Sequence, residues 1–203
     1  MRELIRGCFA GPGIAPDPAG DGAGWERGQN VVPEDRLIDA AVLVPLVDRP
    51  HGMTVLLTRR TEALVRHPGQ VAFPGGRRHT PHETPEETAL REAEEEIGLA
   101  RDRVELIGRL NVRNTGTGFR VTPVVALIDH PVDLRPDPSE VAHIFEVPLE
   151  AVLDPKRLVL ETVMRDGRER EYYVLTHPEH RIWGLTARLL LNLHQVLVES
   201  IGR

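Results

Sequence analysis

Short apolar runs rich in β-branched residues recur along the chain from about Leu37, and they limit the folds open to it. Runs of this length and composition predict β-strands, here at residues 38–47, 54–58, 70–73, 104–110, 121–128, 144–147, 158–165 and 169–175. Helical periodicity marks only two long segments, residues 85–97 and 185–201. Because strands and helices do not alternate regularly, the pattern predicts an α+β domain with a mixed sheet and helices packed on it.

Two local signals refine this prediction. Asp166-Gly167 lies between the last two apolar runs and is a strong turn signal for a β-hairpin. In the final helix, apolar residues recur at helical spacing, so we expect them in the core: Leu189, Leu193, Val196 and Leu197.

Length and composition indicate one globular domain, with 203 residues of which 28% are charged. Residues 11–35 are rich in Gly, Pro and Asp, which disfavours regular structure. We therefore expect an irregular N-terminal extension at 1–36, with a short helix at 2–9 as one option, and a domain at 37–203. The net charge of −6 gives no general attraction to nucleic acid or to an anionic membrane. A single cysteine and the lack of a long apolar span predict a cytoplasmic protein.

The helix at 85–97 is well marked at both ends. Thr84 can cap its N-terminus, Pro85 suits the first helical position, and Glu87 completes a capping box with Thr84. Gly98 is a natural C-terminal stop. At about 100° per residue, one arc is expected to face the core: Ala89, Leu90, Ala93 and Ile97.

Four glutamates crowd the second half of this helix. Glu92, Glu95 and Glu96 share an arc beside the apolar one, whereas Glu94 falls on its other side. Like charges at this spacing repel one another, and more so at a low-dielectric boundary. An isolated acidic run is most often a solvated helix face. The rival interpretation is a site for Mg²⁺ or Mn²⁺, because three converging carboxylates need a counter-charge and hard cations prefer carboxylate oxygens.

A pair of glycines precedes the acidic helix. Gly75 and Gly76 follow an apolar run that ends at Phe73-Pro74. Paired glycines let a backbone turn sharply and approach a ligand closely, although alone they most often mark an ordinary turn. Before an acidic helix they predict a loop that passes close to a diphosphate while the helix holds the bridging metal.

The stretch GGRRHTPHETPEETALREAEEEIGL, residues 75–99, resembles the Nudix box. Seven residues separate Glu83 from a run that matches the box in register: Arg91, Glu92, Ala93, Glu95, Glu96, Gly98 and Leu99. Gly76 stands one residue earlier than the box glycine.

The resemblance extends beyond the box. LLTRRTEALVRHPGQVAFPGG, residues 56–76, is similar to the signature LLTxRSxxxRxxxGxxxFPGG of the coenzyme A pyrophosphatase branch of Nudix hydrolases. Val65 stands where that signature has an arginine. Shorter segments at 117–124, 147–149 and 182–187 are also similar, so the resemblance covers most of residues 37–195.

This resemblance implies an α/β/α sandwich and a pyrophosphohydrolase that uses Mg²⁺ or Mn²⁺. The implied metal ligands are Glu92, Glu95 and Glu96. One of the box acids, or Glu140 outside the box, takes the proton of the attacking water; the candidates are Glu92, Glu95 and Glu140. The implied products of coenzyme A are 3′,5′-ADP and 4′-phosphopantetheine, or its acyl form.

The remaining residues of the motif take supporting roles. Arg91 is expected to pair with Glu83 and fix the loop on the helix, while Gly98 ends the helix. Arginines suit phosphate recognition, so the predicted substrate-binding residues are Arg59, Arg66, Gly75 and Gly76.

Several alternatives stay open. The chain is also compatible with a Nudix hydrolase of a dinucleotide, nucleotide sugar or oxidised nucleotide, or with a non-catalytic nucleotide-binding module. The intact box acids favour an enzyme, and the negative charge disfavours nucleic-acid binding. The nine histidines form no identifiable metal site, since His177 and His180 fall in an expected loop. The oligomeric state is open, with a homodimer as one option.

Overall fold

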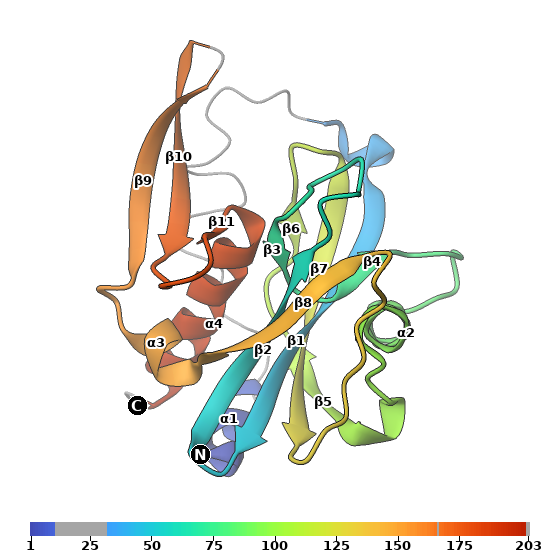
Figure 1. The fold of residues 1–203 in the computed structure, drawn as a ribbon, viewed down its shortest axis with the longest axis vertical. Helices are drawn as coiled ribbons and strands as arrows, with labels where there is room; N and C mark the ends of the chain where they lie inside the picture. The colour runs from blue at the N-terminus through green and yellow to red at the C-terminus, as the bar shows by residue number, and fades with distance from the viewer. Residues whose placement is uncertain (11–31, 166, 202–203) are drawn as a thin grey trace.

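The computed structural model describes residues 1–10, 32–165 and 167–201, and it contains two β-sheets (Figure 1). The larger sheet runs in the order β3-β2-β1-β7-β5, with β4 paired to β1, β6 to β7 and β8 to β2. It is mixed, because β1 and β7 are parallel whereas its other pairs are antiparallel. The smaller sheet is antiparallel, in the order β11-β10-β9.

The strands are β1 (Ile38–Arg49), β2 (Gly52–Arg60), β3 (Val71–Ala72), β4 (Gly75–Arg77), β5 (Val104–Arg109), β6 (Arg113–Asn114), β7 (Phe119–Asp129), β8 (Val141–Pro148), β9 (Leu158–Arg165), β10 (Arg168–Leu175) and β11 (Ile182–Trp183). The α-helices are α1 (Arg2–Phe9), α2 (Pro85–Ile97), α3 (Leu149–Leu153) and α4 (Leu185–Ile201). Short 3₁₀ turns occupy Glu34–Arg36 and Arg101–Arg103.

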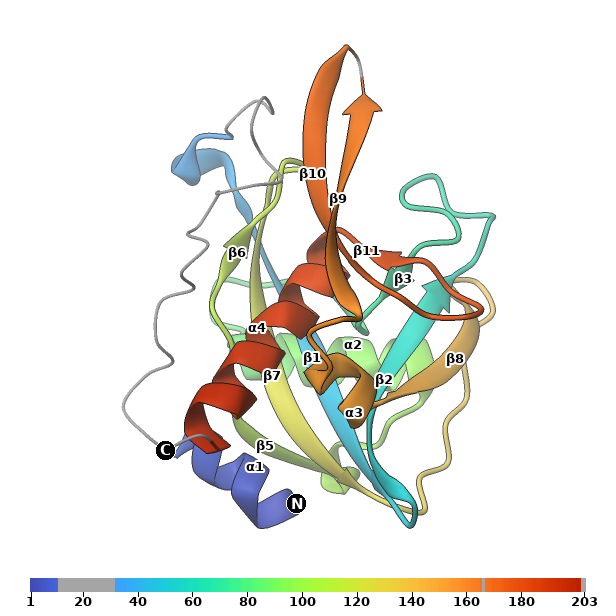
Figure 2. The same cartoon turned by 90° about the vertical axis from the view of Figure 1, so that its left-hand side faces the viewer.

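Helices lie on both faces of the larger sheet, and a separate core fills each side. On one face α2 buries Ala89, Ala93 and Ile97 completely against the sheet, whereas Leu90 is only partly buried. On the other face lies α4 (Figure 2). It contributes the four apolar residues expected in the core, all of them buried. The predicted α/β/α arrangement is therefore confirmed.

Most predicted helices and strands are present in the structure, and the elements that were not predicted are short. Both long helices begin and end where the sequence places them. The unpredicted elements are α3 and the strands β4, β6 and β11, each of two to five residues. Elements this short carry little local signal, because their partners in the tertiary structure decide whether they form. The predicted hairpin is present, since β9 and β10 pair in antiparallel register; Asp166 itself lies outside the described residues.

The first ten residues are packed into the domain. α1 forms at the segment named as an optional helix, and Ile5 is fully buried in the core beneath α4. Arg2 and Arg6 both bind the Glu105 carboxylate on β5, at 2.7 and 2.8 Å. Within the described ranges, no helix has the length and apolar character needed to cross a membrane.

Candidate active site

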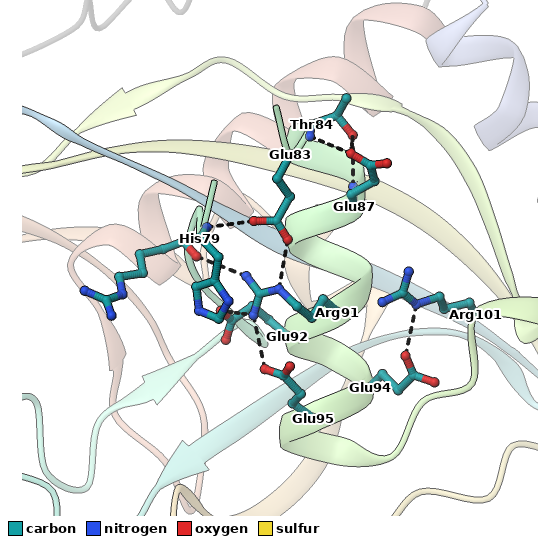
Figure 3. Close-up of polar contacts among 10 residues, drawn as sticks. His79, Glu83, Thr84, Glu87, Arg91, Glu92, Glu94, Glu95 and Arg101 are labelled. Atoms are coloured by element: carbon teal, nitrogen blue, oxygen red, sulfur yellow. Dashed lines mark hydrogen bonds and ion pairs between the residues drawn. The ribbon is translucent and has the colours of Figure 1, made fainter. Parts of the chain in front are cut away.

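The helix α2 is fixed at both ends as its sequence predicts. Thr84 accepts a hydrogen bond from the backbone N–H of Glu87, whose carboxylate accepts one from the Thr84 N–H, and together they form a capping box (Figure 3). Gly98 ends the helix in the left-handed conformation with φ 66°. These caps fix where the glutamates of the last two turns project.

Arg91 joins the preceding loop to the helix. Its Nε lies 2.8 Å from Glu83 Oε1, which is the predicted ion pair, and the other Glu83 oxygen accepts the His79 N–H at 2.7 Å. The hydrogen bond from Arg91, helped by the His79 N–H, lowers the pKa of Glu83 to about 2. A guanidinium–carboxylate contact of this kind fixes orientation as well as distance.

The same guanidinium also holds two of the predicted metal ligands. Arg91 Nη1 lies 2.8 Å from Glu92 Oε1 and 3.1 Å from Glu95 Oε2 (Figure 3). The sequence interpretation assigned no counter-charge to these acids. In the structure the guanidinium of Arg91, on the same helix, provides it. Glu94 lies on the other side of the helix, where it pairs with Arg101 at 2.9 Å, so it is the surface bystander that the sequence predicts.

Glu96 is the most buried acid of the group, with 4% of its surface exposed. Its Oε2 accepts the Gly75 N–H at 3.3 Å, and its Oε1 lies 3.8 Å from Arg60. Burial raises the pKa of Glu96 to about 8, against the opposing charge of Arg60. Burial likewise raises the pKa of Glu92. A buried carboxylate with such distant partners is under-compensated, so additional positive charge here is favourable.

Gly75 and Gly76 let β4 lie close to β1 and to the Glu92 side chain of α2. They do not form the sharp turn expected from the sequence. Both lie in β4, paired with β1, and neither has a positive φ angle. A Cβ on Gly75 would lie 2.5 Å from the Ala41 carbonyl oxygen, and one on Gly76 would lie 2.5 Å from the Glu92 carboxylate. At Gly75 only a residue without Cβ fits, because a Cβ would meet the backbone of β1, whereas at Gly76 a Cβ would force the Glu92 carboxylate to move.

Arg60 belongs to the basic group before the glycine pair in the sequence but was not among the predicted substrate-binding residues, and its position makes it a functional candidate. Its guanidinium lies between Glu96 and Glu140, at 3.8 and 3.9 Å, and its buried Nε has no hydrogen-bond partner among the described residues. Arg60 thus connects Glu140, just before β8, to the acids of α2. The signal was available, because the arginine in the LLTxRS part of the signature aligns with Arg60.

Among the described residues, neither of the two arginines predicted to bind substrate forms an ion pair with an acid of α2. Arg59 pairs with Glu62 at 2.9 Å near the end of β2. Arg66 is exposed in the link between β2 and β3 and makes no ion pair within the described ranges. The neighbouring Val65 is 98% exposed.

The acids fit a hard divalent cation in their chemistry, although they do not converge as they stand. Across the described ranges, no three His, Cys, Asp or Glu side chains are arranged to hold a metal ion. The reason is visible in the contacts: Arg91 draws Glu92 and Glu95 toward itself, whereas Glu96 faces Gly75 and Arg60. Carboxylate oxygens suit Mg²⁺ or Mn²⁺, and a cation beside Glu96 would offset the burial that raises its pKa.

Comparison with known proteins agrees with this geometry. Residues 37–167 match the family model of the NUDIX domain. The chain is 42% identical over 167 residues to the "Uncharacterized Nudix hydrolase NudL" of Photorhabdus laumondii, covering 80% of this chain and 89% of that protein. It is 41% identical over 156 residues to the protein of the same name from Yersinia enterocolitica, covering 77% and 80%.

Among solved structures, the chain is similar to the Nudix hydrolase RenU from M. smegmatis. The two share 27% identity with a TM-score of 0.49 over 59% of this chain and 74% of that one. The domain match spans more than half of the sequence, and it includes the loop, the capped helix and the paired Glu83 and Arg91. The chain therefore belongs to the Nudix hydrolase family, and it is a pyrophosphohydrolase of nucleoside diphosphate derivatives.

Proposed function

We propose that the protein hydrolyses the diphosphate of coenzyme A or its acyl derivatives, giving 3′,5′-ADP and 4′-phosphopantetheine or its acyl form. The observation that carries the hydrolytic part is the buried, under-compensated Glu96 beside Gly75 and Arg60. The signature at residues 56–76 supports coenzyme A as the substrate, because it leads into this same group of residues.

In this proposal Glu92, Glu95 and Glu96 hold Mg²⁺ or Mn²⁺. A bound divalent cation neutralises phosphate oxygens and makes a water molecule acidic enough to supply hydroxide near neutral pH. Arg91 and Glu83 keep α2 and its preceding loop in register, and Gly75 and Gly76 let the backbone lie against the acids.

The proton of the attacking water requires a nearby carboxylate. Glu92 has a pKa raised by burial, and a carboxylate with a raised pKa is a stronger base near neutral pH. Glu140 is half-exposed and 3.9 Å from Arg60, so it combines access to water with proximity to the acids. Glu95 is the third candidate, since it lies at the solvent side of the same helix face.

A substrate panel with Mg²⁺ or Mn²⁺ tests the proposal. Coenzyme A and acetyl-coenzyme A should be hydrolysed with a higher kcat/KM than ADP-ribose, NADH or a dinucleoside polyphosphate. Glu95→Gln should lower kcat by about 10²-fold or more, whereas Glu94→Gln should not. The two glutamates are adjacent and similarly exposed, at 57% and 51%, so Glu94→Gln is a matched control. A much faster reaction with another diphosphate would replace coenzyme A as the assigned substrate.

One observation favours such a replacement. Val65 is 98% exposed where the branch signature has an arginine, so this chain lacks the positive charge of the signature at that position. The second candidate function is therefore hydrolysis of a different nucleoside diphosphate derivative by the same acids. Val65→Arg distinguishes the two: it should lower the KM for coenzyme A only if coenzyme A is the substrate.

A further inference from the structure

A group of four flat side chains lies on the sheet face opposite α2. His143 and Phe145 come from β8, and His177 and His180 come from the link between β10 and β11, which reaches across to β8 (Figure 2). The ring centroids of Phe145 and His180 are 3.9 Å apart, and those of His177 and His180 are 5.2 Å apart at an angle of 22°. His143 stacks on Phe145 at 6.0 Å and 7°. We call these four residues the aromatic platform.

Burial and composition distinguish the platform from an extension of the core. Phe145 packs on the core of this sheet face, but the other three rings are imidazoles, and His143 is exposed. Stacked imidazoles do not direct their nitrogens to one point, and no metal-holding group of three such side chains occurs in the part of the chain that the structure describes. Of the four rings, His143 is exposed, whereas Phe145, His177 and His180 are partly buried.

Local hydrogen bonds fix the orientation of the His177 ring. His177 Nδ1 accepts the backbone N–H groups of Glu179 and His180, each at 3.2 Å, so its proton is on Nε2. Burial lowers the pKa of His180, and the neighbouring histidines lower it further. Oriented aromatic rings are suited to stack on a nucleobase, because every base has a π-face.

Arg59 adds a positive charge at the rim of the platform. It lies opposite His143 in the pairing of β2 with β8. Its positive charge contributes to lowering the pKa of His180. In the described ranges its ion-pair partner is Glu62, in an exposed pair. Exposed pairs of this kind contribute little to stability, so a phosphate can replace Glu62 at little cost.

The platform and the acids meet at the end of β2. Arg59 belongs to the platform, and the next residue, Arg60, lies against Glu96 and Glu140 on the side of α2. Consecutive Cα atoms are about 3.8 Å apart. Successive side chains of a strand point to opposite faces of the sheet, so a single nucleotide reaches both subsites only by passing around the end of β2.

We infer that the aromatic platform and Arg59 bind the nucleoside half of the substrate, with the adenine on the imidazole rings and the ribose 3′-phosphate on Arg59. This inference rests on the proposed function for the identity of the nucleotide. Because the platform binds substrate and takes no part in hydrolysis, loss of the platform should raise KM and leave kcat unchanged.

Direct binding of the adenosine half tests the inference without hydrolysis. Isothermal titration calorimetry in EDTA compares 3′,5′-ADP with adenosine 5′-monophosphate, which lacks the 3′-phosphate. We expect His143→Ala to weaken both ligands by about tenfold, and His143→Phe to retain affinity because the ring face is kept. Arg59→Ala should remove only the preference for 3′,5′-ADP. The matched control is Arg101→Ala, since Arg101 and Arg59 are similarly exposed and each pairs with one glutamate at 2.9 Å.

The outcomes separate this inference from the proposed function. A folded His143→Ala protein with unchanged affinity, or a wild type that does not bind 3′,5′-ADP, overturns the platform. If coenzyme A is hydrolysed and His143→Ala leaves its KM unchanged, the platform is refuted while the proposed function stands. If coenzyme A is not hydrolysed and binding follows the expected pattern, the platform stands and the proposed substrate is wrong.

Discussion

Replacing Glu96 with Gln should stabilise the metal-free protein at neutral pH. Glu96 is 4% exposed, and burial raises its pKa to about 8 from an ordinary 4.5. Because the folded pKa lies above the unfolded pKa, the fold favours the protonated carboxyl. The contribution of this group to stability is therefore complete below pH 4.5 and is lost as the pH rises toward 8.

The size of this loss follows from the two pKa values. Between the ordinary pKa and pH 7, the penalty accumulates at about 1.4 kcal/mol per pH unit and reaches about 3 kcal/mol. Glutamine keeps the shape and can still accept the Gly75 N–H, but it does not ionise. Glu96→Gln should therefore gain up to about 3 kcal/mol at pH 7, which for a chain of this size raises the Tm by about 6–12 °C.

Unfolding in EDTA between pH 5 and pH 8 measures this effect. The difference between wild type and Glu96→Gln should be near zero at pH 5 and should grow steadily with pH. Glu95→Gln is the control, because Glu95 is 57% exposed and should show no such growth. Added Mg²⁺ should stabilise the wild type and not Glu96→Gln. A variant that is destabilised equally at every pH would refute the reasoning.

Three further changes test the structure around the acids. Glu83→Gln should destabilise the protein by about 1–3 kcal/mol at pH 7 in urea unfolding; because the pKa of Glu83 is lowered, the difference from wild type should shrink as the pH falls from 4.5 toward 2. Gly76→Ala should lower kcat while leaving the Tm nearly unchanged, because its Cβ would displace the flexible Glu92 carboxylate; a large fall in Tm or an unchanged kcat would contradict this. Ile5→Ala should cost about 2–5 kcal/mol in the same unfolding assay, since Ile5 is fully buried; a neutral result would show that α1 does not support the core.

The sequence predicts those parts of the site in which the chemistry lies within one element. α2 carries its own start and stop signals, and helical spacing alone separates Glu94 from the other three glutamates. The Arg91–Glu83 pair was predicted from the resemblance to the Nudix box, and only seven residues of loop and helix lie between the two. Local rules suffice where both partners belong to one short stretch of chain.

Contacts between distant segments were outside the reach of these rules. Arg60 meets Glu140 only because β2 and β8 pair antiparallel, with residues 60 and 141 in register. β4 has no strand propensity of its own, so its glycines resemble a turn until β1 pairs with them. His177 and His180 resemble an ordinary loop in the sequence, and their packing against Phe145 depends on how the two sheets approach.

Removal of the Glu140 carboxylate can separate proton transfer from cation binding. Glu140 reaches the acids through Arg60 and is half-exposed, whereas Glu96 is buried on α2. A residue that accepts the proton but does not hold the cation should affect only the rate. We therefore expect Glu140→Gln to lower kcat by about 10²–10⁴-fold while the Mg²⁺-induced rise in Tm is preserved. Glu92→Gln should reduce both, because Glu92 is a proposed cation ligand. If Glu140→Gln leaves kcat unchanged, the proton goes to an acid of α2, and the raised pKa of Glu92 makes it the next residue to assign.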